Sequence, residues 1–95
     1  MKNETKFKTK VLARLKEIPD LWYTKIQMVA IRGVPDILIC YKGQFIAFEL
    51  KTDTGKIDPL QGHILKNIAK AGGVAIVVTP HNVKEIFKEV LWQDY

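Results

Sequence analysis

Two apolar runs separated by a short polar turn constrain the fold of this chain more than any other feature. Residues 36–41 and 44–52 have the length and the β-branched and aromatic content of strands, and Lys42–Gly43 lies between them. A two-residue connection of this kind predicts an antiparallel β-hairpin in which the residues that flank the turn are paired. Both faces of the hairpin are largely apolar, which is typical of a sheet covered on both sides.

Three charges interrupt these runs at positions where a buried sheet face would exclude them. The predicted register places Asp36 opposite Glu49, and Lys51 shares their face because it lies two residues beyond Glu49. Like charges on directly opposed residues repel, so such a pair of acids weakens a hairpin. Two carboxylates beside an ammonium group are, however, a suitable site for Mg²⁺ and a phosphate.

A second interpretation of the same residues remains open. A three-residue loop would shift the pairing by one residue and place Asp36 and Glu49 on opposite faces. Lys42–Gly43 also lacks the Asn or Asp that usually marks a type I′ turn. In that case Asp36 would cap a turn after Pro35, while Glu49 and Lys51 would form a solvated edge.

The spacing of apolar residues predicts the remaining elements. We expect a helix from Asn3 to about Ile18, a strand from Tyr23 to Val29, a helix from Pro59 to about Ala71, a buried strand at 74–79 and a last helix that starts at 80–82. The order α-β-β-β-α-β-α predicts an α/β fold with a mixed sheet flanked by helices on both faces. The strand–helix–strand step should make the last two strands parallel.

Length and charge limit the class of protein. The 95 residues predict one domain that spans residues 1–95, and the net charge of +5 modestly favours a polyanionic partner. No run approaches the roughly 18 apolar residues of a membrane span, and no apolar N-terminal segment resembles a signal peptide. We therefore expect an intracellular protein that needs no membrane and no small-molecule cofactor.

Residues away from the charged cluster have structural explanations. The single cysteine, Cys40, lies in an apolar run and is expected to be a buried thiol in a reducing compartment. His63 and His81 are isolated from other ligand types in the sequence and are expected to be surface or packing residues. Trp22 and Trp92 are expected in the core or in an interface rather than as platforms for base stacking.

A longer string of residues resembles a nuclease family. Pro35–Asp36 and Glu49–Leu50–Lys51 match the two halves of the PD-(D/E)XK nuclease signature. The wider string "RGVPD … FELKTDTGKIDPLQ" resembles the virus-type replication-repair nuclease (VRR-NUC) family within that superfamily, over roughly residues 2–90. The resemblance implies a restriction-endonuclease-like core of order α-β-β-β-α-β and a metal-dependent phosphodiesterase that cuts DNA.

The family motif also implies roles for individual residues. Asp36, Glu49 and the backbone carbonyl of Leu50 match the ligands of a Mg²⁺ or Mn²⁺ ion. Lys51 matches the catalytic lysine, and Gln61 matches a glutamine near the site on the following helix. The acids, the lysine and the glutamine would thus form the catalytic set.

Two of the implied site residues have a structural alternative. Gln61 is the third residue after Asp58, the position at which a capping box forms at the start of a helix. Glu4 is the candidate for a metal-binding glutamate that the family has in its first helix. An acid in a first helical turn also complements the helix dipole.

The expected DNA contacts are basic side chains. Arg32 precedes the motif and Lys56 lies in the loop before the glutamine helix, so both are candidates to contact phosphate. Lys6, Lys10 and Arg14 form a row at four-residue spacing. Such a row is typical of a solvated helix face, but in a basic nuclease it would also contact phosphates without reading sequence.

These observations predict a Mg²⁺- or Mn²⁺-dependent DNA endonuclease. We expect a homodimer that acts on branched DNA, such as four-way junctions or flaps, in replication, repair or recombination. The protein would work in the cytoplasm, or in that of a host cell if its origin is viral or phage-like. The alternatives are a non-catalytic DNA-binding module of the same fold, a sequence-specific restriction-type endonuclease, and a toxin or accessory subunit whose partner supplies specificity.

Overall fold

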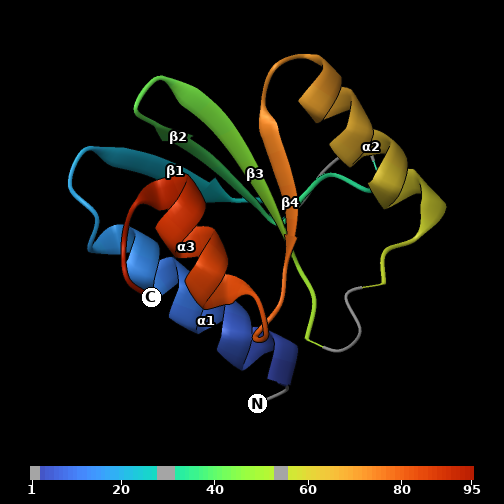
Figure 1. Ribbon diagram of the computed structural model, residues 1–95. Coiled ribbons are helices and arrows are strands. Elements are labelled where there is room, and N and C mark those ends of the chain that lie inside the picture. The colour runs from blue at the N-terminus through green and yellow to red at the C-terminus, as the bar shows by residue number, and fades with distance from the viewer. Residues whose placement is uncertain (1–2, 28–31, 53–55) are drawn as a thin grey trace.

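Helices and strands alternate along the chain in the predicted order. The computed structural model describes residues 3–27, 32–52 and 56–95. Its elements, shown in Figure 1, are α1 (Asn3–Lys16), β1 (Leu21–Lys25), β2 (Ile37–Tyr41), β3 (Gln44–Leu50), α2 (Pro59–Lys70), β4 (Val74–Val78) and α3 (Val83–Leu91). The predicted order and the α/β class are confirmed. In the described part of the chain, no helix has both the length and the apolar character that a membrane crossing requires.

The strands form one mixed sheet in the order β1-β2-β3-β4. The β1–β2 and β2–β3 pairs are antiparallel, and β3 and β4 are parallel, as predicted. The hairpin register pairs Tyr41 with Gln44 and Ile37 with Phe48, which confirms the two-residue loop. Lys42 and Gly43 have φ values of 54° and 76°, and positive φ at both positions is what a type I′ turn requires.

The main core lies between the sheet and the helices α1 and α3. Figure 1 shows these two helices on the same side of the sheet, with α2 on the other side. Alternate residues of β2 and β3 point into this core because the side chains of a strand alternate between its faces. The largest fully buried side chains include Leu15 of α1, Phe87 of α3, and Ile37, Ile39, Ile46 and Phe48 of the sheet.

The opposite face of the sheet is covered only in part. Helix α2 packs mainly against β4. At the hairpin end, Trp22, Cys40 and Phe45 are neighbours in one row across β1, β2 and β3. All three are exposed, and Trp22 has 62% of its surface accessible. The expectation of a buried Cys40 is therefore wrong, and Trp22 does not lie in the core, because no helix extends over this row among the described residues.

The position of Trp92 and the bounds of β1 also differ from the predictions. Trp92 follows α3 and is also exposed, with 68% of its surface accessible. It is therefore not a core residue either. Strand β1 begins and ends earlier than the predicted strand, and the last two residues of that prediction, Met28 and Val29, lie outside the described residues. His63 and His81 are exposed, as expected.

Candidate active site

The open end of the β2–β3 hairpin holds the first predicted acid. Asp36 lies directly before β2, and its Oδ2 accepts a hydrogen bond from the Leu50 N–H at 2.8 Å. A continued antiparallel ladder would direct that N–H to the main chain of Pro35, which the register places opposite Leu50. The carboxylate replaces this main-chain acceptor, so β2 begins at Ile37 and Asp36 is fixed at the end of the sheet.

The second acid lies one residue before the end of β3, the strand that pairs with both β2 and β4. Glu49 is buried, with only 4% of its surface exposed. Its Oε2 accepts a hydrogen bond from Gln61 Nε2 at 3.0 Å and lies 3.5 Å from Lys51 Nζ. The structure thus brings Glu49, Lys51 and Gln61 together, and the prediction that Glu49 and Lys51 share a face is confirmed.

Gln61 also forms the capping box that the sequence suggested. Its backbone N–H donates to Asp58 Oδ1 at 2.8 Å, and its side-chain Oε1 accepts from the Asp58 N–H at 3.1 Å. The same amide therefore uses its oxygen to close the start of α2 and its nitrogen to bind Glu49. The capping-box interpretation of Gln61 is confirmed, and the same side chain also contacts Glu49, because an amide has separate donor and acceptor atoms. The role of Gln61 in a catalytic site stays a prediction.

The carboxyl group of Glu49 resists ionisation. Burial and, next to it, the neighbouring Asp36 carboxylate raise the pKa of Glu49 from 4.5 to about 7, while the Lys51 ammonium opposes the shift. The hairpin register, continued by one pair beyond Ile37 and Phe48, places the two acids opposite each other and accounts for this effect. A further cation between them would relieve their repulsion.

Lys8 contacts one of the predicted site residues, and the sequence did not indicate this contact. It lies on α1 next to the buried Phe7, and its Nζ is 3.5 Å from Asp36 Oδ1. Its position on the helix is visible in the sequence, one turn after Glu4. Its partner is not visible, because that depends on how α1 crosses the end of the sheet.

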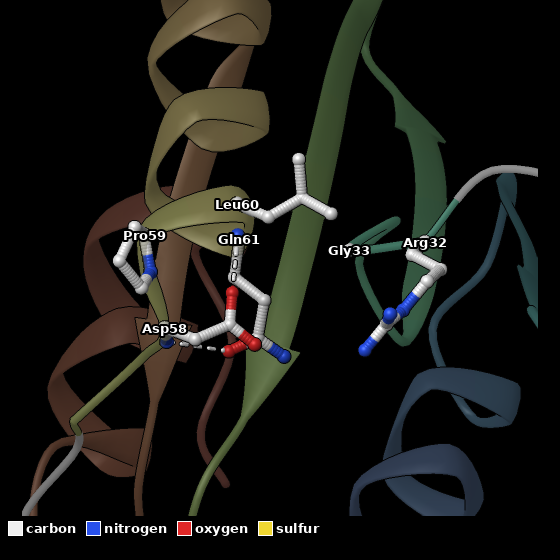
Figure 2. Close-up of a pocket in the computed structure, with 6 residues that line it drawn as sticks. All are labelled: Arg32, Gly33, Asp58, Pro59, Leu60 and Gln61. Carbon is white, nitrogen blue, oxygen red and sulfur yellow. Dashed lines mark hydrogen bonds between the residues drawn. The ribbon is translucent and has the colours of Figure 1, made fainter.

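A pocket of about 690 Å³ lies beside Gln61, between the start of α2 and the segment that precedes β2. Figure 2 shows Arg32 and Gly33 on one side and the α2 residues on the other. Gly33 has a φ of +85°, and a Cβ there would lie 2.9 Å from Leu60 Cγ. Glycine therefore allows the segment to dock on α2. The lining residues are Arg32, Gly33, Asp58, Pro59, Leu60 and Gln61.

The basic row on α1 divides into residues with different surroundings. Lys10 Nζ and the Arg14 guanidinium lie 5.1 and 5.8 Å from the centre of the Tyr95 ring. Arg14 is also 4.0 Å from Glu17. Lys6 is exposed. Two members of the row thus hold the Tyr95 ring, and their predicted contact with DNA stays a prediction.

The other predicted residues lie at the surface. Arg32 and Lys56 are exposed, as a contact with phosphate requires. Glu4 is exposed in the first turn of α1. Within residues 3–27, 32–52 and 56–95 there is no group of three or more His, Cys, Asp or Glu side chains suited to a metal ion. The role of Glu4 as a further ligand therefore stays a prediction.

The donor atoms at this end of the sheet fit a hard divalent cation. Asp36 and Glu49 supply carboxylate oxygens, and Mg²⁺ usually takes one or two carboxylates together with water and phosphate. In an extended strand the N–H and C=O of one residue point to the same side. Because the Leu50 N–H points to Asp36, its carbonyl oxygen faces the same side and would be available as a third donor.

Comparisons with protein-family models, with curated proteins and with solved structures found no match for this chain.

Proposed function

We propose that this protein is a Mg²⁺- or Mn²⁺-dependent DNA endonuclease of the VRR-NUC type, with a PD-(D/E)XK core. The observation that carries the proposal is the meeting of Asp36, Glu49, Lys51 and Gln61 at one end of the sheet. These four side chains come from three separate segments, and they are the residues that match the family motif. The element order of the fold is also the order that the family implies.

The metal would be held by Asp36, Glu49 and the Leu50 carbonyl. A divalent ion bound there supplies Lewis-acid chemistry, which polarises a phosphoryl oxygen and lowers the pKa of a bound water. The protein holds both acids before any ion arrives. Asp36 is fixed by the Leu50 N–H, and Glu49 is fixed by the Gln61 amide.

Lys51 and Gln61 have distinct tasks in this proposal. The Lys51 ammonium lies beside Glu49 and is partly exposed, so it can approach a phosphate and stabilise the negative charge that develops during hydrolysis. Gln61 positions Glu49 and remains tied to the cap of α2, so we regard it as a positioning residue. Loss of Lys51 should therefore affect the chemical step more than the binding of DNA.

The pocket next to Gln61 would take the nucleotide beside the bond that is cut. Arg32 offers a guanidinium to a phosphate, and Leu60, which is 43% exposed, offers an apolar surface to a sugar or base. Leu60 is next to Gln61, which touches Glu49, and Arg32 lies across the pocket from them. DNA that enters this pocket would therefore reach the acids without a large rearrangement.

A homodimer acting on branched DNA completes the proposal. A domain of 95 residues has little surface with which to hold a duplex, and two copies related by a two-fold axis would present two sites to two strands. Sedimentation of the free protein and of its complex with a four-way junction tests the assembly. A monomer in both states would contradict this part alone.

The central experiment is a cleavage assay that compares matched variants. Wild-type protein, Asp36→Asn and Lys51→Ala are titrated with Mg²⁺ or Mn²⁺ against duplex, flap, splayed-arm and four-way DNA. Asp20→Asn is the control, because Asp20 is an exposed acid in the turn after α1 whose left-handed φ of 60° suits Asn. We expect both site variants to lose cleavage at least about 100-fold, while Asp20→Asn keeps it.

The assay also separates the alternatives. Equal cleavage by wild type and Asp36→Asn would remove the proposed metal site. Binding of DNA without cleavage at any metal concentration would instead indicate a DNA-binding module. Cleavage confined to one short duplex sequence would indicate a restriction-type enzyme.

A further inference from the structure

We propose that Lys8 is a displaceable counter-ion, which holds the metal-binding oxygen of Asp36 in the metal-free protein and leaves it when a divalent ion binds. This inference rests on the proposed metal site and adds to it a residue that the motif does not include. It makes Lys8 a determinant of metal affinity.

The two oxygens of Asp36 have unequal partners. Oδ2 accepts the hydrogen bond from the Leu50 N–H at 2.8 Å, so it is committed to the end of the sheet. Oδ1 is 3.5 Å from Lys8 Nζ. Oδ1 has both lone pairs free of that main-chain contact, so a cation meets less competition from the sheet there, where the Lys8 ammonium already lies.

Lys8 and Lys51 reach the two acids from different parts of the fold. Lys51 is on β3 itself, two residues from Glu49, and lies against the oxygen that also accepts from Gln61. Lys8 comes from α1, on a long side chain that is 32% exposed. A half-exposed ion pair of this length contributes little to stability, so Lys8 can move into solvent at small cost.

Removal of this charge should make the metal bind more tightly. A unit charge a few ångströms from the ion opposes its binding, even when water screens much of the effect. The freed ammonium would also remain near the site, where a DNA phosphate is a favourable partner. Lys8 would thus lower the affinity for metal alone while it favours the complex with DNA.

The test is a Mn²⁺ titration of DNA-free protein, in which electron paramagnetic resonance counts the free ion. We expect Lys8→Gln to bind Mn²⁺ about three- to tenfold more tightly than wild type, because one repelling charge is gone. Lys8→Arg keeps the charge and should stay within about twofold of wild type. Lys16→Gln removes the same charge from an exposed position at the end of α1 and is the matched control.

The possible results distinguish a failure of the proposed role of Lys8 from a failure of the proposed metal site. Lys8→Gln binding no more tightly than Lys16→Gln, with both proteins folded by circular dichroism, would overturn the role of Lys8 and leave the nuclease proposal intact. Absence of Mn²⁺ binding in wild type would overturn the metal site itself, and the counter-ion role with it. Tight binding by Lys8→Gln and wild-type affinity in Lys8→Arg would support the proposal.

Discussion

The side chain of Gln61 links the start of a helix to a buried acid. Its Oε1 accepts from the Asp58 N–H and its Nε2 donates to Glu49. Neither contact can be lost without an effect on the other, because the capped helix holds the amide in place. Gln61 therefore transmits the position of α2 to the carboxylate.

Substitutions at the cap should show how much the contact with Glu49 adds to the stability that the cap provides. Asp58→Ala removes the side-chain cap and should destabilise the protein by about 1 kcal/mol. Gln61→Leu removes the reciprocal bond and also leaves the buried Glu49 without its amide donor, so we expect a loss of about 2–3 kcal/mol. Urea unfolding of the metal-free proteins measures both. Equal losses would contradict the added contribution that we expect from the contact with Glu49.

The raised pKa of Glu49 predicts a pH-dependent stability. A group whose folded pKa of about 7 exceeds its usual 4.5 stabilises the fold below pH 4.5, and this contribution is lost as the pH rises through 7. The loss amounts to about 3 kcal/mol. Glu49→Gln should remove this slope from the metal-free protein, as unfolding at several pH values would show.

Metal should reverse that slope, since the ion binds the ionised carboxylate. We expect the rise in melting temperature on addition of Mg²⁺ to be larger at pH 8 than at pH 6. The corresponding rise in Asp36→Asn should be small at both. A larger effect of Mg²⁺ at pH 6 would contradict the assignment of Glu49 as a ligand.

At the scale of elements, the Arg32–Gly33 segment can approach α2 because Gly33 has no side chain. Gly33→Ala combines an unfavourable positive φ with a close contact to Leu60, so we expect a loss of about 2–3 kcal/mol. Gly43→Ala is the matched control. Its φ is +76°, but a Cβ there meets nothing within 4 Å, so the cost should be only about 1 kcal/mol.

The same comparison tests the pocket. Gly33→Ala should weaken DNA binding, because it displaces Arg32 from α2, while Gly43→Ala in the hairpin turn should leave binding unchanged. Fluorescence anisotropy with labelled duplex measures both. If the two variants bind DNA equally well, the pocket beside Gln61 does not receive the substrate.

Local rules predicted the elements and the central pair of strands. The two-residue loop fixed the register of the hairpin, and that register brought Asp36 and Glu49 to the same end. The turn lacks the Asn or Asp that is typical of type I′, but Lys42 nevertheless adopts the positive φ that this turn requires. The two-residue loop is therefore possible with this sequence. Lys8 was missed because its partner is distant in sequence and depends on how α1 lies across the sheet.

At the scale of the whole molecule, the positive charge is divided between basic side chains that pack against the fold and a basic side chain that faces the pocket. Arg14 lies over the Tyr95 ring and next to Glu17, whereas Arg32 lines the pocket. We expect Arg32→Gln to weaken DNA binding about five- to tenfold. The slope of the logarithm of the binding constant against the logarithm of salt concentration should become shallower by about one. Arg14→Gln should change stability more than binding. Anisotropy titrations at several salt concentrations measure both slopes.

Burial on the second face of the sheet was the least predictable feature. Cys40 and Phe45 lie in runs that look equally apolar on both faces, so the pattern predicted a sheet covered throughout. The extent of the cover depends on where α2 packs, and it packs mainly against β4. The exposure of Trp22 and Cys40 follows from that position and not from their neighbours in sequence.

The exposed thiol of Cys40 is a natural attachment site for a fluorescent label. Cys40 is the only cysteine in the chain and lies on β2, four residues after Asp36, which directly precedes that strand. At the usual rise of a strand this separation is roughly 13 Å. A fluorophore attached there would be dimmed by a paramagnetic ion arriving between the acids, so occupancy could be followed in real time without altering any residue of the site.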